Sequence, residues 1–244
     1  MTDFSIVIPA YNEEDLLPET LKSLKTILGE LSAKFAGEII VVDNNSTDKT
    51  GEIARAFGAK LVFERENCIA RARNAGAAAA EGLYIIFIDA DTLAPTELIE
   101  KAILSMASGE VCGGGCIVGF EEGEVDNTAK ILAELWNRLI VRIYPVAAGS
   151  FVFCLKEAWK AVGGFDERYY ASEEIHFSTA LRRWGRSKGL KFKIIPMKVK
   201  SSSRKFKTYS KWQIFQRIMP LILFPWRLRN RKSCSIWYER KNQR

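Results

Sequence analysis

The sequence predicts an α/β protein in which a central, mostly parallel sheet is flanked by helices. Short runs of β-branched residues alternate with longer segments of helical period through the first hundred positions, a pattern typical of parallel strands joined by crossover helices. The run YIIFI at 84–88 is apolar throughout, as expected for a strand covered on both faces. With 48% hydrophobic and 27% charged residues, the chain of 244 residues has the composition of a globular protein.

Four β-α units are predicted in the first half of the chain. The expected strands are 4–8, 38–42, 60–63 and 84–88. Helices are expected from about Glu14, from a cap at Ser46 or Thr47 to Phe57, and over the alanine-rich segment 70–80. This arrangement favours a doubly wound, nucleotide-binding architecture.

The second half is less regular, and we expect it to extend the same sheet. The predicted strands are 111–120, 149–155 and 191–195, and the predicted helices are 95–107, 126–141, one from Lys156, and 172–186. No internal repeat or low-complexity linker interrupts the chain. We therefore predict a single domain over 1–203, followed by a basic, aromatic, helical tail over 204–244.

The tail carries the basic character of the chain. The net charge is +7, but residues 204–244 hold 12 lysines and arginines against one acid, which is +11, so residues 1–203 carry −4. Basic and aromatic residues interleave in this tail, as they do in helices that lie on anionic membrane surfaces. The alternative is a packed helix with a solvated basic face. A nucleic-acid binder is a weaker alternative, because the body is acidic.

Other features disfavour several classes of protein. The odd number of cysteines and their wide spread predict buried, reduced thiols in a cytoplasmic protein; they are Cys68, Cys112, Cys116, Cys154 and Cys234. The N-terminal residues lack the pattern of a signal peptide, and no apolar run approaches the roughly 20 residues of a membrane span. The single histidine, His176, excludes a zinc site with several histidines.

Polar residues follow three of the predicted strands. They are Pro9 to Glu13 after the first strand, Asp43 to Ser46 after the second, and Asp89, Ala90 and Asp91 after the fourth. Because ligands of open α/β sheets bind at the carboxyl ends of the strands, we expect these residues to meet. Asp89 and Asp91 can face one hard cation, Mn²⁺ or Mg²⁺, whose remaining ligands are water and diphosphate oxygens. The alternative for this pair is a turn before the helix that Pro95 opens.

Five segments together resemble a known family. They are SIVIPAYNEED, IIVVDNNSTDKT, ARARNAGAAAAEG, YIIFIDADT and VGGFDERYYASEEIHFSTALRRWG, and they span about residues 4–195. In this order and at this spacing they resemble the family 2 glycosyltransferases, which have the GT-A fold. The resemblance implies inverting transfer of a sugar from a nucleotide diphosphate sugar to an acceptor hydroxyl, usually with a divalent metal ion. Residues 1–92 would then bind the donor, and 93–203 the acceptor.

The resemblance also implies roles at the donor site. Pro9, Tyr11 and Glu13 would line the nucleotide, with Glu13 reaching the ribose, and Asp43 matches an acid that hydrogen-bonds uracil, which favours a UDP-sugar. Arg73 matches a family position near the diphosphate, and a guanidinium fork suits phosphate oxygens. Solvation on the surface is the alternative for Asp43 and the arginines. The full expected set is Pro9, Tyr11, Glu13, Asp43, Asn45, Arg71, Arg73, Asp89, Ala90, Asp91 and Arg204, the last of which would close over the diphosphate with Lys205 and Lys207.

Inversion requires a base that takes the proton of the acceptor hydroxyl. The resemblance places it in a Glu-Asp pair at the start of a helix, and the matching residues are Glu173 and Glu174. We expect Glu174, in the position of the aspartate, to be the base, with Glu173 as the second choice. The alternative is that both acids only complement the helix dipole.

The remaining motifs have more than one interpretation. Residues 163–166, Gly-Gly-Phe-Asp, match the family's loop before the catalytic helix, while His176 stands where many members have an acid, and its role stays open. Three tryptophans either stack on sugar rings or belong to the core: Trp136, Trp159 and Trp184. The glycine-rich segment 112–116 has two thiols, too few for a metal site, and is expected to line the acceptor.

Two further functions compete with glycosyl transfer. A sugar-phosphate nucleotidyltransferase also needs metal carboxylates beside a nucleotide, although the first loop lacks a glycine- and arginine-rich triphosphate cradle. A catalytically inactive sugar-nucleotide-binding protein is the other, because Glu174 and His176 depart from the family pattern. A nicotinamide dehydrogenase is excluded, since no Gly-x-Gly-x-x-Gly follows the first strand. The acceptor would be a glycan, a lipid-linked sugar or a small molecule.

Overall fold

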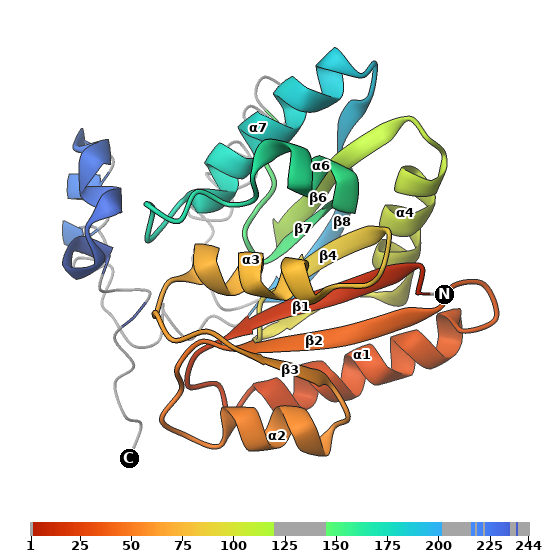
Figure 1. Cartoon of the computed structure of the whole chain (residues 1–244), viewed down its shortest axis with the longest axis horizontal. Helices are drawn as coiled ribbons and strands as arrows, with labels where there is room; N and C mark the ends of the chain where they lie inside the picture. The colour runs from red at the N-terminus through yellow and green to blue at the C-terminus, as the bar shows by residue number, and fades with distance from the viewer. Residues whose placement is uncertain are drawn as a thin grey trace.

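One eight-stranded sheet runs through the protein in the order β3-β2-β1-β4-β7-β6-β8-β5 (Figure 1). The computed structural model describes residues 2–119, 145–201, 216–217, 219–221, 223–234 and 238. The predicted helix over 126–141 with Trp136, and the predicted diphosphate-closing residues Arg204, Lys205 and Lys207, lie outside these residues. The prediction that both halves share one sheet is confirmed, because strands from each are hydrogen-bonded neighbours.

The first four long strands are parallel and agree closely with the predicted ones. They are β1 (Phe4–Ala10), β2 (Gly37–Asp43), β3 (Lys60–Phe63) and β4 (Tyr84–Ile88). Beyond β4 the direction changes, since β7 (Phe151–Leu155) is antiparallel to both β4 and β6 (Val111–Gly119). The long strand β8 (Lys191–Ser201) is parallel to β6, and the two-residue β5 (Thr92–Leu93) is antiparallel to β8. The sequence did not predict β5.

Helices cover both faces of the sheet. One face packs against α1 (Leu17–Leu31), α2 (Thr50–Ala56) and α4 (Thr96–Ala107), and the other against α3 (Ile69–Ala79), α6 (Lys156–Val162) and α7 (Glu173–Ser187). Alternate residues of β1 serve the two cores, because Ile6 and Ile8 lie in the first and Val7 in the second. The predicted mixed α/β class, with a mostly parallel sheet between helices, is thus confirmed.

Two helices begin later than predicted because loop side chains bond across to each other. The helix expected from Glu14 begins at Leu17, and the one expected from Ser46 or Thr47 begins at Thr50. Ser46 accepts a hydrogen bond from the backbone N–H of Asn12, 3.1 Å away, and Thr47 donates its own N–H to the side chain of Asn12. Ser46 therefore fastens one loop to another instead of capping a helix.

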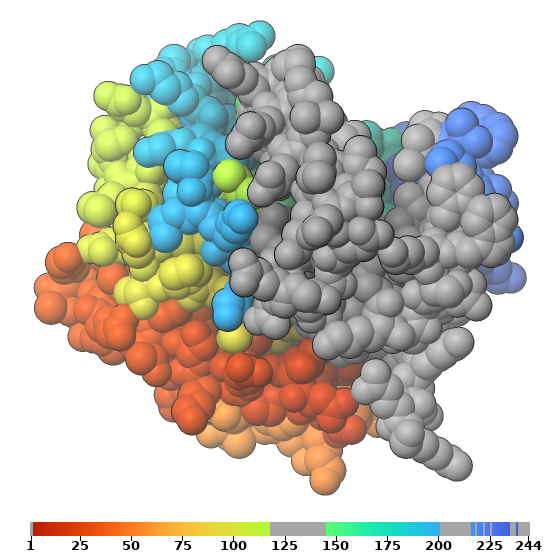
Figure 2. All heavy atoms as spheres, turned by 180° about the vertical axis from the view of Figure 1, so that it is seen from behind, coloured from red at the N-terminus to blue at the C-terminus, as the bar shows by residue number. Residues whose placement is uncertain are grey.

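The described C-terminal residues pack beside the loop that precedes α7. They include two short 3₁₀ helices, η1 (Pro225–Arg229) and η2 (Arg231–Cys234). Ala171, Leu221 and Cys234 form a small buried cluster. From behind, this blue segment and the yellow-green α4 lie at opposite edges of the molecule (Figure 2). No described helix has the length and apolarity needed to cross a membrane.

Candidate active site

The carboxyl ends of β2, β1 and β4 lie next to one another, with β1 in the middle. Ala10 at the end of β1 is in register with Asp43 at the end of β2, and Asn44 donates its backbone N–H to the carbonyl of Ala10. Asp89 follows β4 directly. The structure therefore brings the three predicted polar clusters to one edge of the sheet.

The loop after β1 is fixed to the loop after β2. Asn12, in the left-handed region with φ 51°, bonds Ser46 and Thr47, and the N–H of Glu13 donates to Oγ1 of Thr50 over 2.8 Å. Pro9 and Glu13 are buried, and Tyr11 is half-buried. These bonds hold the predicted nucleotide-lining residues against the segment that contains Asp43 and Asn45.

Asp43 forms a turn with its own loop. Its Oδ1 accepts the backbone N–H of Ser46 over 2.9 Å. A Cβ placed on Gly51 would lie 3.0 Å from Oδ2 of Asp43, so the glycine gives this carboxylate room. Asp43 is half-buried and Asn45 is exposed, with a left-handed φ of 63°. The contact between Asp43 and a nucleotide base stays a prediction.

Asn44 is an organising residue that the sequence analysis did not assign. It is buried, and its side-chain N–H₂ donates to the carbonyls of Glu64 and Glu66 while its Oδ1 accepts the N–H of Cys68. These bonds fasten the segment before α3 to the end of β2. The polar run DNNS after an apolar strand is the sequence signal that could have identified it.

The Asp89-Ala90-Asp91 segment is held from both sides. The carbonyl of buried Ala90 accepts a 2.8 Å hydrogen bond from Oγ1 of Thr20 on α1. Immediately after Asp91, β5 pairs with residues 200–201 of β8. Asp89 and Asp91 are both half-buried, so their carboxylates sit on a segment whose backbone is fixed.

Arg73 joins this segment to the start of α7. Its guanidinium donates to Oδ1 of Asp89 over 3.0 Å, to the carbonyl of Gly149 over 2.8 Å, and to the carboxylate of Glu173. The side chains of Arg73 and Glu173 are 1% and 4% exposed. The ring of Phe165 lies 5.3 Å from the guanidinium carbon. Arg73 thus has carboxylate partners in the protein, and its contact with a diphosphate stays a prediction.

The predicted base, Glu174, lies in the same cluster. Ser172, with φ 61°, turns the chain into α7, which places Glu173 and Glu174 in the first helical turn. A Cβ on Gly149 would lie 3.7 Å from the carboxyl carbon of Glu174 and 3.3 Å from a guanidinium nitrogen of Arg73. Gly149 therefore lets the backbone approach Arg73 closely, a role that sequence analysis missed, while Glu174 lies at an ordinary contact distance.

The cluster has more negative than positive groups. Burial and the neighbouring charge of Glu173 raise the pKa of Glu174 to about 8, although Arg73 acts in the opposite direction. One guanidinium thus faces three acids, Asp89, Glu173 and Glu174. The neighbouring acids thus favour the protonated form of Glu174.

The donor atoms at Asp89 and Asp91 fit a hard divalent cation. Both offer carboxylate oxygens, and Mg²⁺ is commonly held by one or two carboxylates with water and substrate phosphates. No three acidic, histidine or cysteine side chains gather in a metal-binding arrangement within the described residues. A cation held by Asp89 and Asp91 would need further ligands from water or from a bound diphosphate.

Several other predicted residues lie away from the Arg73 cluster. Arg71 pairs instead with Glu167, 2.9 Å away, and lies 3.5–3.6 Å from Glu66 and Glu64. His176 is exposed and stacks on the ring of Tyr169. With residues 163–167 of the glycine-containing loop, it lines a pocket of about 440 Å³.

The cysteines and two of the tryptophans belong to the interior. All five cysteines are buried free thiols, which confirms the prediction of reduced, buried sulfhydryls. Trp159 and Trp184 are partly buried against the second core, and the indole N–H of Trp159 donates to the side chain of Asn74. Both tryptophans therefore follow the core interpretation.

A sequence-profile match over most of the chain identifies its family. A sequence profile described as Glycosyl transferase family 2 matches residues 5–162. The chain belongs to glycosyl transferase family 2. Its curated relatives include the glycosyltransferase AglE of Haloferax volcanii, 28% identical over 71% of this chain and 59% of that protein. An undecaprenyl-phosphate 4-deoxy-4-formamido-L-arabinose transferase of Klebsiella pneumoniae is 30% identical over 64% of this chain and 48% of its own length.

Solved structures share the fold of this family 2 chain. The mannosyltransferase PcManGT of Pyrobaculum calidifontis, in complex with GDP-Man and Mn²⁺, superposes with a TM-score of 0.68 at 20% identity, over 98% of this chain and 65% of that one. The TarS fragment 1–349 of S. aureus, in complex with UDP-GlcNAc, gives 0.56 at 22% identity, over 74% and 53%. The expectation of a GT-A fold is confirmed.

The chain spans only part of its relatives. The uncharacterized glycosyltransferase EpsJ of Bacillus subtilis is 27% identical over 57% of this chain, and the match covers 40% of that protein. The matches to AglE and to the Klebsiella transferase cover 59% and 48% of those proteins. The family profile matches residues 5–162, which contain the three strand ends and Arg73 but not Glu173 and Glu174.

Proposed function

We propose that the protein transfers a sugar, with inversion, from a nucleotide diphosphate sugar to an acceptor hydroxyl, with Glu174 as the base. The observation that carries the proposal is the Arg73 cluster, in which one buried guanidinium touches both Asp89 and Glu173. The predicted cation-binding segment and the predicted base helix therefore meet at one residue. Metal-assisted sugar transfer requires this proximity, since donor diphosphate and acceptor must be held together.

The donor is proposed to be a UDP-sugar held by a divalent cation at Asp89 and Asp91. The nucleotide would lie on the joined loops that contain Tyr11, Glu13 and Asp43. Related complexes support this class of donor, because structural neighbours were solved with GDP-Man and Mn²⁺, with UDP-GlcNAc, and with Mn²⁺ and UDP. A bound Mn²⁺ or Mg²⁺ would neutralise charge on the leaving diphosphate.

The two glutamates differ in a way that assigns the base. Glu173 is buried, and its carboxylate accepts a hydrogen bond from the guanidinium of Arg73. Glu174 is half-buried, and burial and the neighbouring Glu173 raise its pKa to about 8. A carboxylate with a raised pKa is a stronger base once it is ionised. Glu174 would take the acceptor proton, while Glu173 holds the arginine.

The proposal is tested by nucleotide release from a panel of UDP-, GDP- and dTDP-sugars, with and without Mn²⁺. Release from one donor that needs Mn²⁺ and is lost in Asp91→Asn is expected. Glu19→Gln, an exposed acid on α1, is the matched control and should behave as the wild type. Pyrophosphate release would instead identify a nucleotidyltransferase. Thermal stabilisation by a donor without any release, even with candidate acceptors, would indicate an inactive binder.

A further inference from the structure

We propose that the C-terminal patch, defined as Leu223, Phe224, Trp226, Arg227, Arg231 and Lys232, docks on an anionic lipid membrane. Docking there would present the active site to acceptors that lie in or on that membrane. This consequence rests on the proposed function. The patch belongs to the segment around η1 and η2, which lies beside the loop before α7 (Figure 1).

The apolar residues of the patch are exposed and lie close together in the sequence. Leu223, Phe224 and Trp226 are 62%, 43% and 68% exposed, and the rings of Phe224 and Trp226 are 5.1 Å apart. The other large apolar side chains that are exposed in the described part of the chain are scattered on different elements: Phe63, Leu83, Leu104 and Ile175. Three such residues within four positions form a patch, whereas the scattered ones need no partner.

The charged part of the patch has one sign. No acidic residue occurs between Glu174 and Glu239 of the sequence. Arg227, Arg231 and Lys232 are exposed, and none of them forms an ion pair with a described residue. Each basic residue near an anionic membrane surface contributes attraction, and an adjacent tryptophan suits the boundary between headgroups and acyl chains. Charge and apolarity therefore point to the same occupant.

A membrane fits these observations better than a nucleic acid. Leu223 is aliphatic and offers no ring for stacking on bases, which single-strand binders use. The acidic body, residues 1–203, would also repel a long polyanion that extends beyond the patch. A membrane surface needs contact with only one face of the protein. An oligonucleotide nevertheless belongs in the test.

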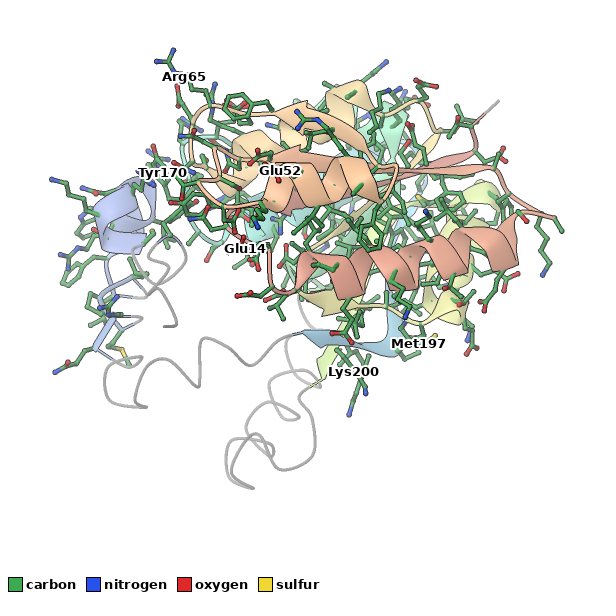
Figure 3. All side chains as sticks on the ribbon, turned by 90° about the horizontal axis from the view of Figure 1, so that it is seen from below. Glu14, Glu52, Arg65, Tyr170, Met197 and Lys200 are labelled. Carbon is green, nitrogen blue, oxygen red and sulfur yellow. The ribbon has the colours of Figure 1, made fainter. Side chains whose placement is uncertain are left out.

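Hydrogen bonds attach the patch to the loop before the proposed base. The backbone N–H of Tyr170 donates to the carbonyl of Leu228 over 2.8 Å, and Arg229 donates to the hydroxyl of Tyr169 over 2.9 Å. Figure 3 shows Tyr170 next to the blue C-terminal segment. The patch is thus the outer side of a packed segment, so docking would fix the orientation of the Glu173–Glu174 turn relative to the membrane.

A tyrosine from the end of the segment strengthens this attachment. The hydroxyl of Tyr238 donates to the carbonyl of Tyr170 over 2.9 Å and accepts the N–H of Ile69, the first residue of α3, over 3.3 Å. The segment therefore contacts both the helix that carries Arg73 and the loop that leads to Glu173.

Co-sedimentation of the full chain with vesicles tests the proposal. Vesicles of phosphatidylcholine mixed with phosphatidylglycerol are expected to bind the protein, and pure phosphatidylcholine vesicles are expected to bind it much less. The double variant Leu223→Ala/Trp226→Ala should lose about tenfold or more in partitioning, and Lys232→Gln, which removes an exposed charge, about fivefold. Leu104→Ala, which removes an exposed leucine on α4, is the matched control and should bind as the wild type.

Three results would overturn the proposal. They are equal binding to neutral and anionic vesicles, unchanged binding by the double variant, and binding to a single-stranded oligonucleotide but not to vesicles. Thermal unfolding midpoints of all variants identify any that fail to fold, and Lys232→Gln then replaces the double variant. Vesicle binding needs no turnover, and nucleotide release needs no vesicles, so failure of docking and failure of the proposed transferase activity are separately visible.

Discussion

Arg73 on α3 contacts Asp89 at the end of β4 and Glu173 at the start of α7, two residues that are 84 positions apart in sequence. Both contacts use hydrogen bonds from the same guanidinium, which is almost completely buried. Charged groups that are taken out of water depend on their partners. The positions of Asp89, a proposed metal ligand, and of Glu173, beside the proposed base, therefore both depend on the side chain of Arg73.

Replacing Arg73 should damage both stability and activity. In Arg73→Met the carboxylate of Glu173 stays buried without its partner, which typically costs about 3–5 kcal/mol of unfolding free energy. Urea unfolding measures this loss. Arg71→Met, on the same helix but partly exposed, should cost less than about 1 kcal/mol. Equal effects of the two substitutions would contradict the assignment of Arg73 as the link.

The two glutamates should separate in their effects. Glu174→Gln should lower kcat by about 10²- to 10⁴-fold, because it removes the proposed base, while the donor still stabilises the protein against heat. Glu173→Gln should instead lower the unfolding free energy, since it weakens the pair with Arg73. A Glu174→Gln enzyme with normal kcat would eliminate Glu174 as the base.

The pH dependence of activity follows from the raised pKa of Glu174. The base must be ionised, and burial and Glu173 raise its pKa to about 8 in the free protein. We expect kcat/KM to rise with pH, to be half-maximal near pH 8 and to level off about one pH unit above that, because kcat/KM reports the free enzyme. A pH-rate profile that is already flat from pH 5 would show that this carboxyl has an ordinary pKa.

The raised pKa of Glu174 also makes stability depend on pH. Stability is expected to fall over the pH range in which activity rises. The folded state holds the proton of Glu174 up to about pH 8, whereas the unfolded chain releases it near pH 4.3. Between these values the folded state binds more protons, so this group's contribution to stability falls as the pH rises. Unfolding of wild type and Glu174→Gln across pH 5–9 measures it. The unfolding free energy of Glu174→Gln should lack the part of the decrease with pH that comes from this carboxyl.

Gly149 provides a test of close packing. A methyl group at this position would lie 3.3 Å from a guanidinium nitrogen of Arg73 and 3.7 Å from the carboxyl carbon of Glu174. Gly149→Ala should therefore shift the guanidinium of Arg73 by a few tenths of an ångström and lower kcat, whereas the carboxyl of Glu174 stays at an ordinary contact distance. Gly29→Ala on α1, where nothing lies within 4 Å, should leave activity unchanged and stabilise the helix by about 0.5–1 kcal/mol. Assays of kcat and urea unfolding on both variants decide this.

Much of the fold could be predicted because local patterns determine it. The apolar runs that form β1 to β4 are long, β-branched and bounded by polar turns, and the strand at 84–88 has the predicted limits. The antiparallel direction of β7 could not be predicted, since direction depends on which strand it pairs with. The late starts of α1 and α2 depend on Asn12 bonding Ser46 and Thr47, contacts between residues more than 30 positions apart.

The candidate site was predictable in its residue types but not in its pairings. Acids after strands and in the first turn of a helix are visible in the sequence, and so is an arginine in the alanine-rich helix. That Arg73 is buried between Asp89 and Glu173, and that Arg71 contacts other acids, follows from the helical turn of α3 and from tertiary packing. The polar run DNNS could have identified Asn44, but its bonds to the carbonyls of Glu64 and Glu66, like the approach of Gly149 to Arg73, join segments that are distant in sequence.

The contacts of Tyr238 and Leu228 bear on where this chain can be shortened. A chain cut after Ser201 would keep every strand of the sheet, yet it would lose the hydroxyl that meets the first N–H of α3 and the carbonyl that meets Tyr170. It would also uncover Ala171, which is buried against Leu221 and Cys234. The change in composition near residue 204 is therefore not a boundary of packing, and an expression fragment that stops there would leave the turn before Glu173 without its support.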